Sequence, residues 1–98
     1  MTAVFKEPGR FPTVVELPRT KAAAEKKLGG KYQAYPCLRG AMILCREDDA
    51  ALPFNIHFMG DVYRGPILML GRDGDKPVDL SEQLCRTLLK ALHQKEDR

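Results

Sequence analysis

The apolar residues of this chain fall in short runs, and turns that contain glycine or proline separate most of the runs. The longest runs hold about five residues, which suits strands rather than helices when turn residues bound them. Connections of a few residues can join antiparallel strands, whereas parallel strands need a crossover of about a dozen residues or more. The chain is therefore expected to build a mainly antiparallel sheet.

Two segments instead carry helical signals. Residues 21–28 are rich in alanine and lysine, follow Thr20 as a candidate N-cap and end before Gly29, which suits a left-handed C-cap. A second helix is expected after Ser81, also a good N-cap, because a stripe of apolar residues recurs there at helical spacing: Leu84, Cys85, Leu88, Leu89 and Leu92. Its tail, residues 94–98, is expected to fray.

The expected strands and helices define an α+β fold. The predicted strands cover residues 3–7, 13–17, 32–38, 41–46 and 66–70, so the antiparallel sheet has about five strands. Each helix has one apolar face, and we expect both helices to pack on one face of the sheet. Residues 50–63 show no clean period and are expected to form an irregular loop. A chain of 98 residues builds one core, so residues 1–98 form a single domain.

Cysteines and charge limit the classes of function. The three cysteines, Cys37, Cys45 and Cys85, are an odd number without a CxxC pair, which indicates structural thiols in a reducing compartment. The start of the chain does not resemble a signal peptide, and no apolar run approaches the roughly twenty residues of a spanning helix. We expect a cytoplasmic protein without a membrane partner. The net charge is only +3, and the basic residues are scattered along the chain among acidic ones. The sequence therefore shows neither the basic stripe of a nucleic-acid binder nor the acidic face of a DNA mimic.

No motif predicts a catalyst, a metal site or a cofactor, since phosphate-loop, dinucleotide, calcium-loop and zinc spacings are all absent from the sequence. Ligand-binding candidates come from the irregular loop and a neighbouring strand: Asn55, His57, Asp61 and Tyr35. A pair of His57 with Asp61, or with a cysteine, would be needed for a small hydrolase-like enzyme, which is one alternative. Asn55 has two readings, a cap for the loop backbone or a recognition group in a cleft, and the structural reading is favoured.

A second alternative is weak binding of nucleic acid by aromatic and basic residues of one predicted hairpin: Lys31, Tyr32, Arg39 and Arg46, with Tyr35 beside them. Aromatic rings can stack on bases while cations neutralise phosphates. The low net charge makes a half-exposed strand the simpler reading, so nucleic acid is possible as a partner but not favoured.

Several short motifs also occur in a suggestive order. They are Gly29-Gly30 after the first helix, residues 52–55 (LPFN), residues 65–71 (GPILMLG) and residues 80–82 (LSE) at the start of the last helix. This order resembles domain-of-unknown-function family 3846, small uncharacterised proteins of phages and mobile elements in Gram-positive gut bacteria. The resemblance implies no assigned activity, and it draws attention to the asparagine at Asn55. The alanine-lysine first helix departs from the family's usual pattern, which puts in doubt any role for that surface.

The resemblance implies a bacterial or phage accessory protein, and the absence of catalytic motifs favours a non-enzymatic binding module. Its partner is expected to be a protein or a small ligand, held by the 52–63 segment and a face of the sheet. The oligomeric state and the order of the strands are not predicted.

Overall fold

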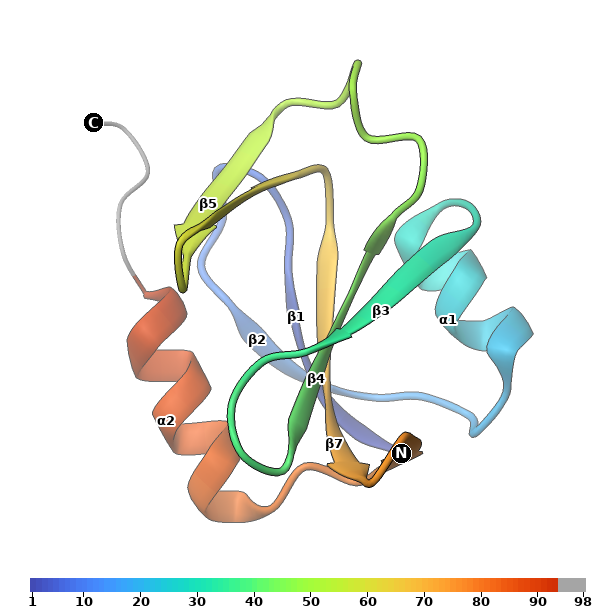
Figure 1. Cartoon of the computed structure of the whole chain (residues 1–98), viewed down its shortest axis with the longest axis vertical. Coiled ribbons are helices and arrows are strands. Elements are labelled where there is room, and N and C mark those ends of the chain that lie inside the picture. Colours follow the sequence, from blue (N-terminus) through green and yellow to red (C-terminus); the bar gives the residue numbers. More distant parts are fainter. Residues whose placement is uncertain (94–98) are drawn as a thin grey trace.

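The computed structural model describes residues 1–93, so the predicted frayed tail, 94–98, lies outside the described residues. Within residues 1–93, two helices and eight strands follow one another (Figure 1). Their bounds are β1 (Thr2–Lys6), β2 (Thr13–Glu16), α1 (Lys21–Leu28), β3 (Tyr32–Pro36), β4 (Ala41–Arg46), β5 (Phe54–Phe58), β6 (Asp61–Arg64), β7 (Ile67–Asp73), β8 (Lys76–Val78) and α2 (Glu82–Leu92). Neither helix has the length and apolar character needed to cross a membrane.

The main sheet has six strands, and every pairing within it is antiparallel. Its order is β2-β1-β7-β4-β3, and β8 pairs with the end of β7 beyond the stretch that β1 covers. β5 and β6 form a separate two-stranded hairpin. The α+β class and the antiparallel sheet are confirmed.

The two helices pack on opposite faces of the main sheet, so the prediction that both lie on one face is wrong. Side chains alternate between faces along β4: Met42 and Leu44 join the cluster under α1, whereas Ile43 and Cys45 join the cluster under α2. The runs in β4 and β7 are apolar on both faces, as is typical of strands buried on both sides. Each face therefore needs its own cover, which α1 gives on one side and α2 with the β5–β6 hairpin on the other.

The segment predicted to be an irregular loop, residues 50–63, instead contains β5 and the larger part of β6. Its turn is formed by Met59 and Gly60, both with positive φ (51° and 85°), as a two-residue hairpin turn requires. The register shifts between Phe54 and Ile56, where a bulge interrupts the alternation of side chains. That bulge hides the strand period in the sequence.

The predicted helix ends are confirmed. The Thr20 hydroxyl accepts a hydrogen bond from the Ala23 amide, and Gly29 ends α1 with a φ of 87°. The Ser81 hydroxyl accepts from the Leu84 amide at the start of α2. Cys85, Leu88 and Leu92 of α2 are buried against the sheet, as the apolar stripe predicts.

Candidate functional site

An open groove of about 500 Å³ lies between the β3–β4 strands and the β5–β6 hairpin. β3 and β4 supply its floor and one wall, because Gln33 and Tyr35 pair with Cys45 and Ile43 and project toward the hairpin side of the sheet. β6 supplies the opposite wall, and the 47–49 turn closes one end. The full lining is Gln33, Tyr35, Pro36, Cys45, Arg46, Glu47, Asp49, Asp61, Val62 and Tyr63.

The groove is acidic. Among the described residues, Glu47, Asp49 and Asp61 line it together with one basic residue, Arg46. The Arg46 guanidinium is engaged elsewhere, since it donates to both carboxylate oxygens of Asp48 (2.8 and 3.0 Å) and to the Leu28 carbonyl (3.1 Å). This ion pair raises the pKa of Arg46 and lowers the pKa of Asp48. Among the described residues that line the groove, no other cation is present to neutralise the three carboxylates.

Aromatic and apolar side chains accompany these carboxylates. Tyr35 and Val62 are about half exposed, and the Tyr35 hydroxyl donates to the Gln33 side chain. Tyr63 is buried, and this burial, together with the negative charge of Asp61, raises its pKa to about 12. The groove can therefore offer both negative charge and rings or methyl groups to a ligand.

The raised pKa of Tyr63 predicts a loss of stability in alkali. In the unfolded chain a tyrosine loses its proton near pH 10, whereas folded Tyr63 keeps its proton to about pH 12. Between these two values the unfolded state binds fewer protons than the folded state, so stability falls as the pH rises. Tyr63→Phe is expected to remove this part of the fall. Urea unfolding of both proteins, at pH 8 as the reference and at steps above pH 10, checks it; parallel curves would contradict it.

Asn55 lies under the hairpin rather than in the groove. It is fully buried, and its amide nitrogen donates to the carbonyls of Lys6 (2.9 Å) and Gly65 (2.7 Å). Its amide oxygen accepts from the ammonium of Lys6 at 2.8 Å. All the donors and the acceptor of this side chain are turned inward, so we assign Asn55 the structural one of its two predicted readings. It ties the hairpin to β1 and to the connection between β6 and β7.

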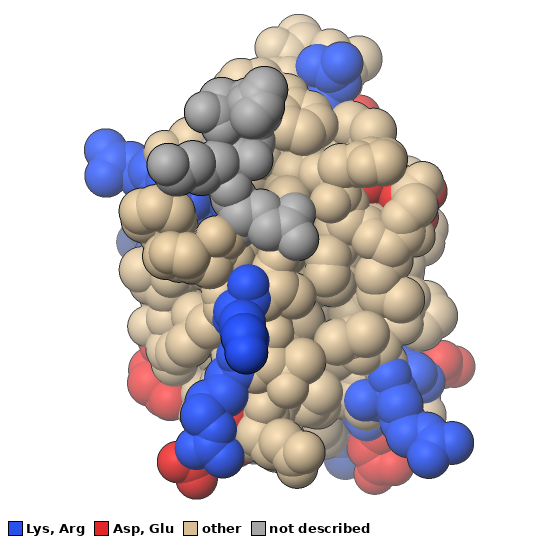
Figure 2. Space-filling model, turned by 90° about the vertical axis from the view of Figure 1, so that its left-hand side faces the viewer, with Lys and Arg blue, Asp and Glu red and all other residues tan. Residues whose placement is uncertain are grey.

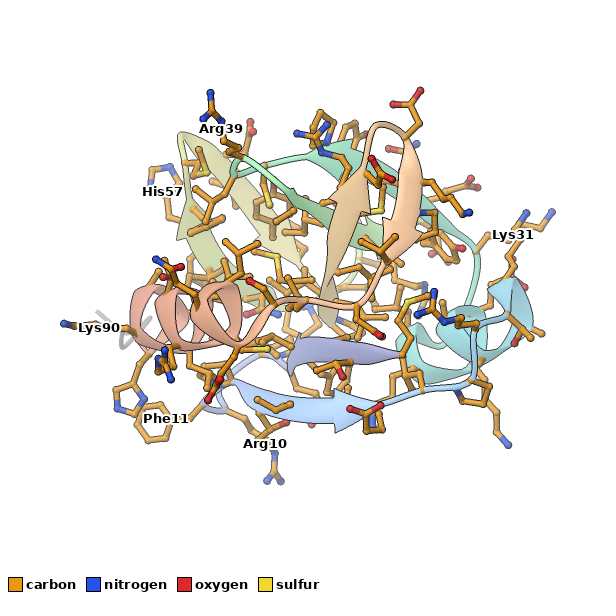
Figure 3. The ribbon with its side chains drawn as sticks, turned by 90° about the horizontal axis from the view of Figure 1, so that it is seen from below. Arg10, Phe11, Lys31, Arg39, His57 and Lys90 are labelled. Atoms are coloured by element: carbon orange, nitrogen blue, oxygen red, sulfur yellow. The ribbon has the colours of Figure 1, made fainter. Side chains whose placement is uncertain are left out.

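His57 and Asp61 lie on opposite faces of the hairpin. His57 pairs with Val62 and both are exposed, whereas Asp61 pairs with Phe58, whose ring is buried. Figure 3 shows His57 projecting outward from the hairpin. This arrangement does not bring His57 and Asp61 together as a pair. Of the four predicted ligand-binding residues, only Tyr35 and Asp61 line the groove.

The residues of the nucleic-acid alternative are not brought together. Tyr32 faces the α1 side, where burial raises its pKa, while Tyr35 faces the hairpin side. Lys31 and Arg39 lie at opposite ends of β3 and point away from each other (Figure 3). On the face shown in Figure 2, Lys and Arg side chains are scattered beside Asp and Glu rather than gathered in a stripe.

The three cysteines are free thiols. Burial raises the pKa of Cys37, Cys45 and Cys85, and the charge of Asp49 adds to this effect at Cys45. A raised pKa keeps a thiol protonated and poorly nucleophilic at neutral pH. Among residues 1–93, no three His, Cys, Asp or Glu side chains are placed to hold a metal ion.

Sequence reasoning missed most of the groove. No role was predicted for Gln33, Glu47, Asp49 or Tyr63. The alternation of β3 with Tyr35 at its exposed end was the one available signal, since it places Gln33 and Tyr35 on one face. Nothing in the local sequence around Lys6 announces a buried lysine.

The fold and the groove define a small α+β domain with an acidic surface site between its sheet and a hairpin. The sequence model of a domain of unknown function, DUF3846, matches residues 1–93, and the chain therefore belongs to that family. Searches of curated proteins and of solved structures returned no match.

Proposed function

We propose that this protein is a non-enzymatic binding module that holds a positively charged ligand or a basic segment of a protein partner in the groove. The observation that carries the proposal is the local charge: three carboxylates line a groove of about 500 Å³ on a molecule whose net charge is +3. Charges of one sign in a cleft attract a ligand of the opposite sign and speed its arrival. Exposed Tyr35 and Val62 add apolar contact area beside them.

Binding is favoured over catalysis by the placement of the reactive groups. His57 and Asp61 are on different faces of the hairpin, and the thiols are held protonated by burial. A catalytic base must come within hydrogen-bond reach of the group that it activates. Cationic recognition, in contrast, needs only carboxylates on a shaped surface.

The biological setting that we propose is a cytoplasmic accessory protein of a bacterium, phage or mobile element. The three free cysteines support a reducing compartment. The DUF3846 match places the chain in a family without an assigned activity.

Cationic probes test the proposed site. Spermine and a short lysine-rich peptide are each titrated into isotope-labelled protein while the amide signals of the groove residues are followed. We expect shifts at Tyr35, Asp61 and Val62, and binding that weakens with added salt. Asp61→Asn should weaken binding about two- to fivefold, as the loss of one exposed ion pair would.

A matched control removes the same charge elsewhere. Asp75 lies in the exposed β7–β8 turn and does not line the groove, so Asp75→Asn should leave binding of both probes unchanged. If neither probe moves the groove signals, or if both variants weaken binding equally, the groove is not the cation-binding site.

A further inference from the structure

β3 is an edge strand. Among the described residues, it pairs with β4 on one side and with no strand on the other. It ends the sheet order β2-β1-β7-β4-β3, and four of its five residues are exposed. The Glu47 amide donates to the Lys31 carbonyl, and the Cys37 amide donates to the Ala41 carbonyl. These bonds show that the odd-numbered residues of this strand direct their backbone N–H and C=O groups toward β4. In an antiparallel pair the alternate residues point their N–H and C=O groups the other way. Tyr32 and Ala34 therefore present both groups at the free edge, and Pro36 presents its carbonyl.

The same edge borders the acidic groove. Gln33, Tyr35 and Pro36 belong both to β3 and to the lining of the groove. If another strand were added beside β3, its side chains opposite Gln33 and Tyr35 would project over the groove, because side chains across a pair share a face. These positions are two residues apart in the added strand. Their side chains would meet the carboxylates Glu47, Asp49 and Asp61.

We propose that the occupant of the groove is an extended, basic segment of a partner protein that adds to β3 as a further strand, with Lys or Arg at alternate positions. This inference rests on the proposed function and specifies its ligand. Backbone hydrogen bonds to Tyr32 and Ala34 would give affinity that does not depend on the sequence of the added strand. The groove would select the side chains at alternate positions, and known examples of strand addition combine affinity and specificity in this way. The basic side chains can pair with the three carboxylates there, because Arg46, the one basic residue of the described lining, is held by Asp48.

Charge decides against two other occupants. A second copy of this chain paired edge to edge through β3 would bring two acidic grooves side by side, and like charges placed together oppose association. Nucleic acid would place phosphates against the same carboxylates. The charge of a basic peptide complements the groove, and the backbone of the peptide can pair with the neighbouring strand edge.

The probe for strand addition is a short, acetylated peptide of alternating threonine and lysine. We expect it to slow hydrogen exchange of the Tyr32 and Ala34 amides, while the amides of Gln33 and Tyr35, which already face β4, stay unchanged. The same peptide with glutamate in place of lysine should not bind. A threonine-lysine peptide that is N-methylated at the residues facing β3 should bind roughly tenfold more weakly, because it has lost edge hydrogen bonds.

One protein variant makes the complementary change. Ala34→Pro removes an outward N–H that the sheet does not use, and proline is tolerated at sheet edges. It should weaken peptide binding by roughly tenfold while spermine binding is retained. The N-methylated peptide gives the same information with unchanged protein if Ala34→Pro melts early.

The outcomes separate this inference from the proposed function. Equal binding of the methylated and unmethylated peptides, with Asp61→Asn still weakening both, overturns strand addition and leaves a cation-binding groove. If the wild-type protein binds neither spermine nor the lysine-containing peptides, both the proposed function and strand addition are overturned. Sedimentation that shows a dimer abolished by Ala34→Pro would assign the β3 edge to a second copy and would also overturn the inference.

Discussion

Replacing Asn55 by alanine is expected to lower the free energy of unfolding by about 3 kcal/mol, the upper part of the range for leaving buried polar groups unsatisfied. The wild-type side chain is fully buried and donates to the carbonyls of Lys6 and Gly65. Alanine would leave both carbonyls without this donor in a site that water does not reach. It would also remove the oxygen that accepts from the Lys6 ammonium at 2.8 Å, and a charged donor makes that loss larger.

Urea unfolding of Asn55→Ala beside the wild type measures this effect. Gln83→Ala is the control, because Gln83 is an exposed amide of α2 and its loss should change stability by no more than about 0.5 kcal/mol. Asn55→Asp separates charge from shape: it keeps an oxygen for Lys6 but turns a second oxygen toward the two carbonyls, so it should also destabilise the fold. An unchanged melt of Asn55→Ala would contradict the structural role and return the residue to the ligand-binding candidates.

Local chemistry in the sequence was sufficient for the helix ends and for several strands. Thr20 and Ser81 cap the helices because a short hydroxyl can reach the amide three residues on, which depends on no distant residue. The Arg39-Gly40 turn joins β3 to β4 between the two strands predicted at 32–38 and 41–46, with Gly40 at a φ of 79°. Such features can be read from a few neighbouring residues.

Three features of the fold were not predicted, each for a different reason. The β5–β6 hairpin was missed because its turn uses Met59 at positive φ, where glycine or asparagine is usual, and because its bulge disturbs the alternation. The amide of Asn55 looks like a loop residue in sequence, yet its partner Lys6 lies 49 positions away. The opposite placement of the helices was readable in principle, since residues 41–45 and 67–70 are apolar on both faces.

The candidate site also combines features that depend on distant contacts with features that depend on local ones. Tyr35 and Asp61 line one groove because two hairpins fold against each other, and no spacing in the sequence predicts that. His57 failed to join them for a local reason, namely that side chains alternate along a strand. Side-chain alternation can be used only where a strand is recognised, and residues 50–63 show no clean strand period in the sequence. The missed hairpin thus accounts for the misplaced histidine.

Leu88→Ala is expected to lower the free energy of unfolding by roughly 2–4 kcal/mol, the range for emptying the site of a core leucine. Leu88 is fully buried in the centre of α2, within the cluster that includes Val4, Ile43 and Met69. An isolated helix as short as α2 is marginal in water, so α2 depends on this packing rather than on its own propensity.

Neighbouring positions of α2 supply graded controls for this loss. Thr87→Ala changes an exposed side chain and should alter stability by no more than about 0.5 kcal/mol, while Leu89→Ala, at a partly buried position, should fall between the two. Urea midpoints that shift while the slope stays constant would identify each change as one of stability alone. The assignment of α2 to the sheet face opposite α1 depends on this order of stability losses. If Leu88→Ala destabilised the protein as little as Thr87→Ala, the apolar stripe of α2 would not face the core, and something other than α2 would cover that face of the sheet.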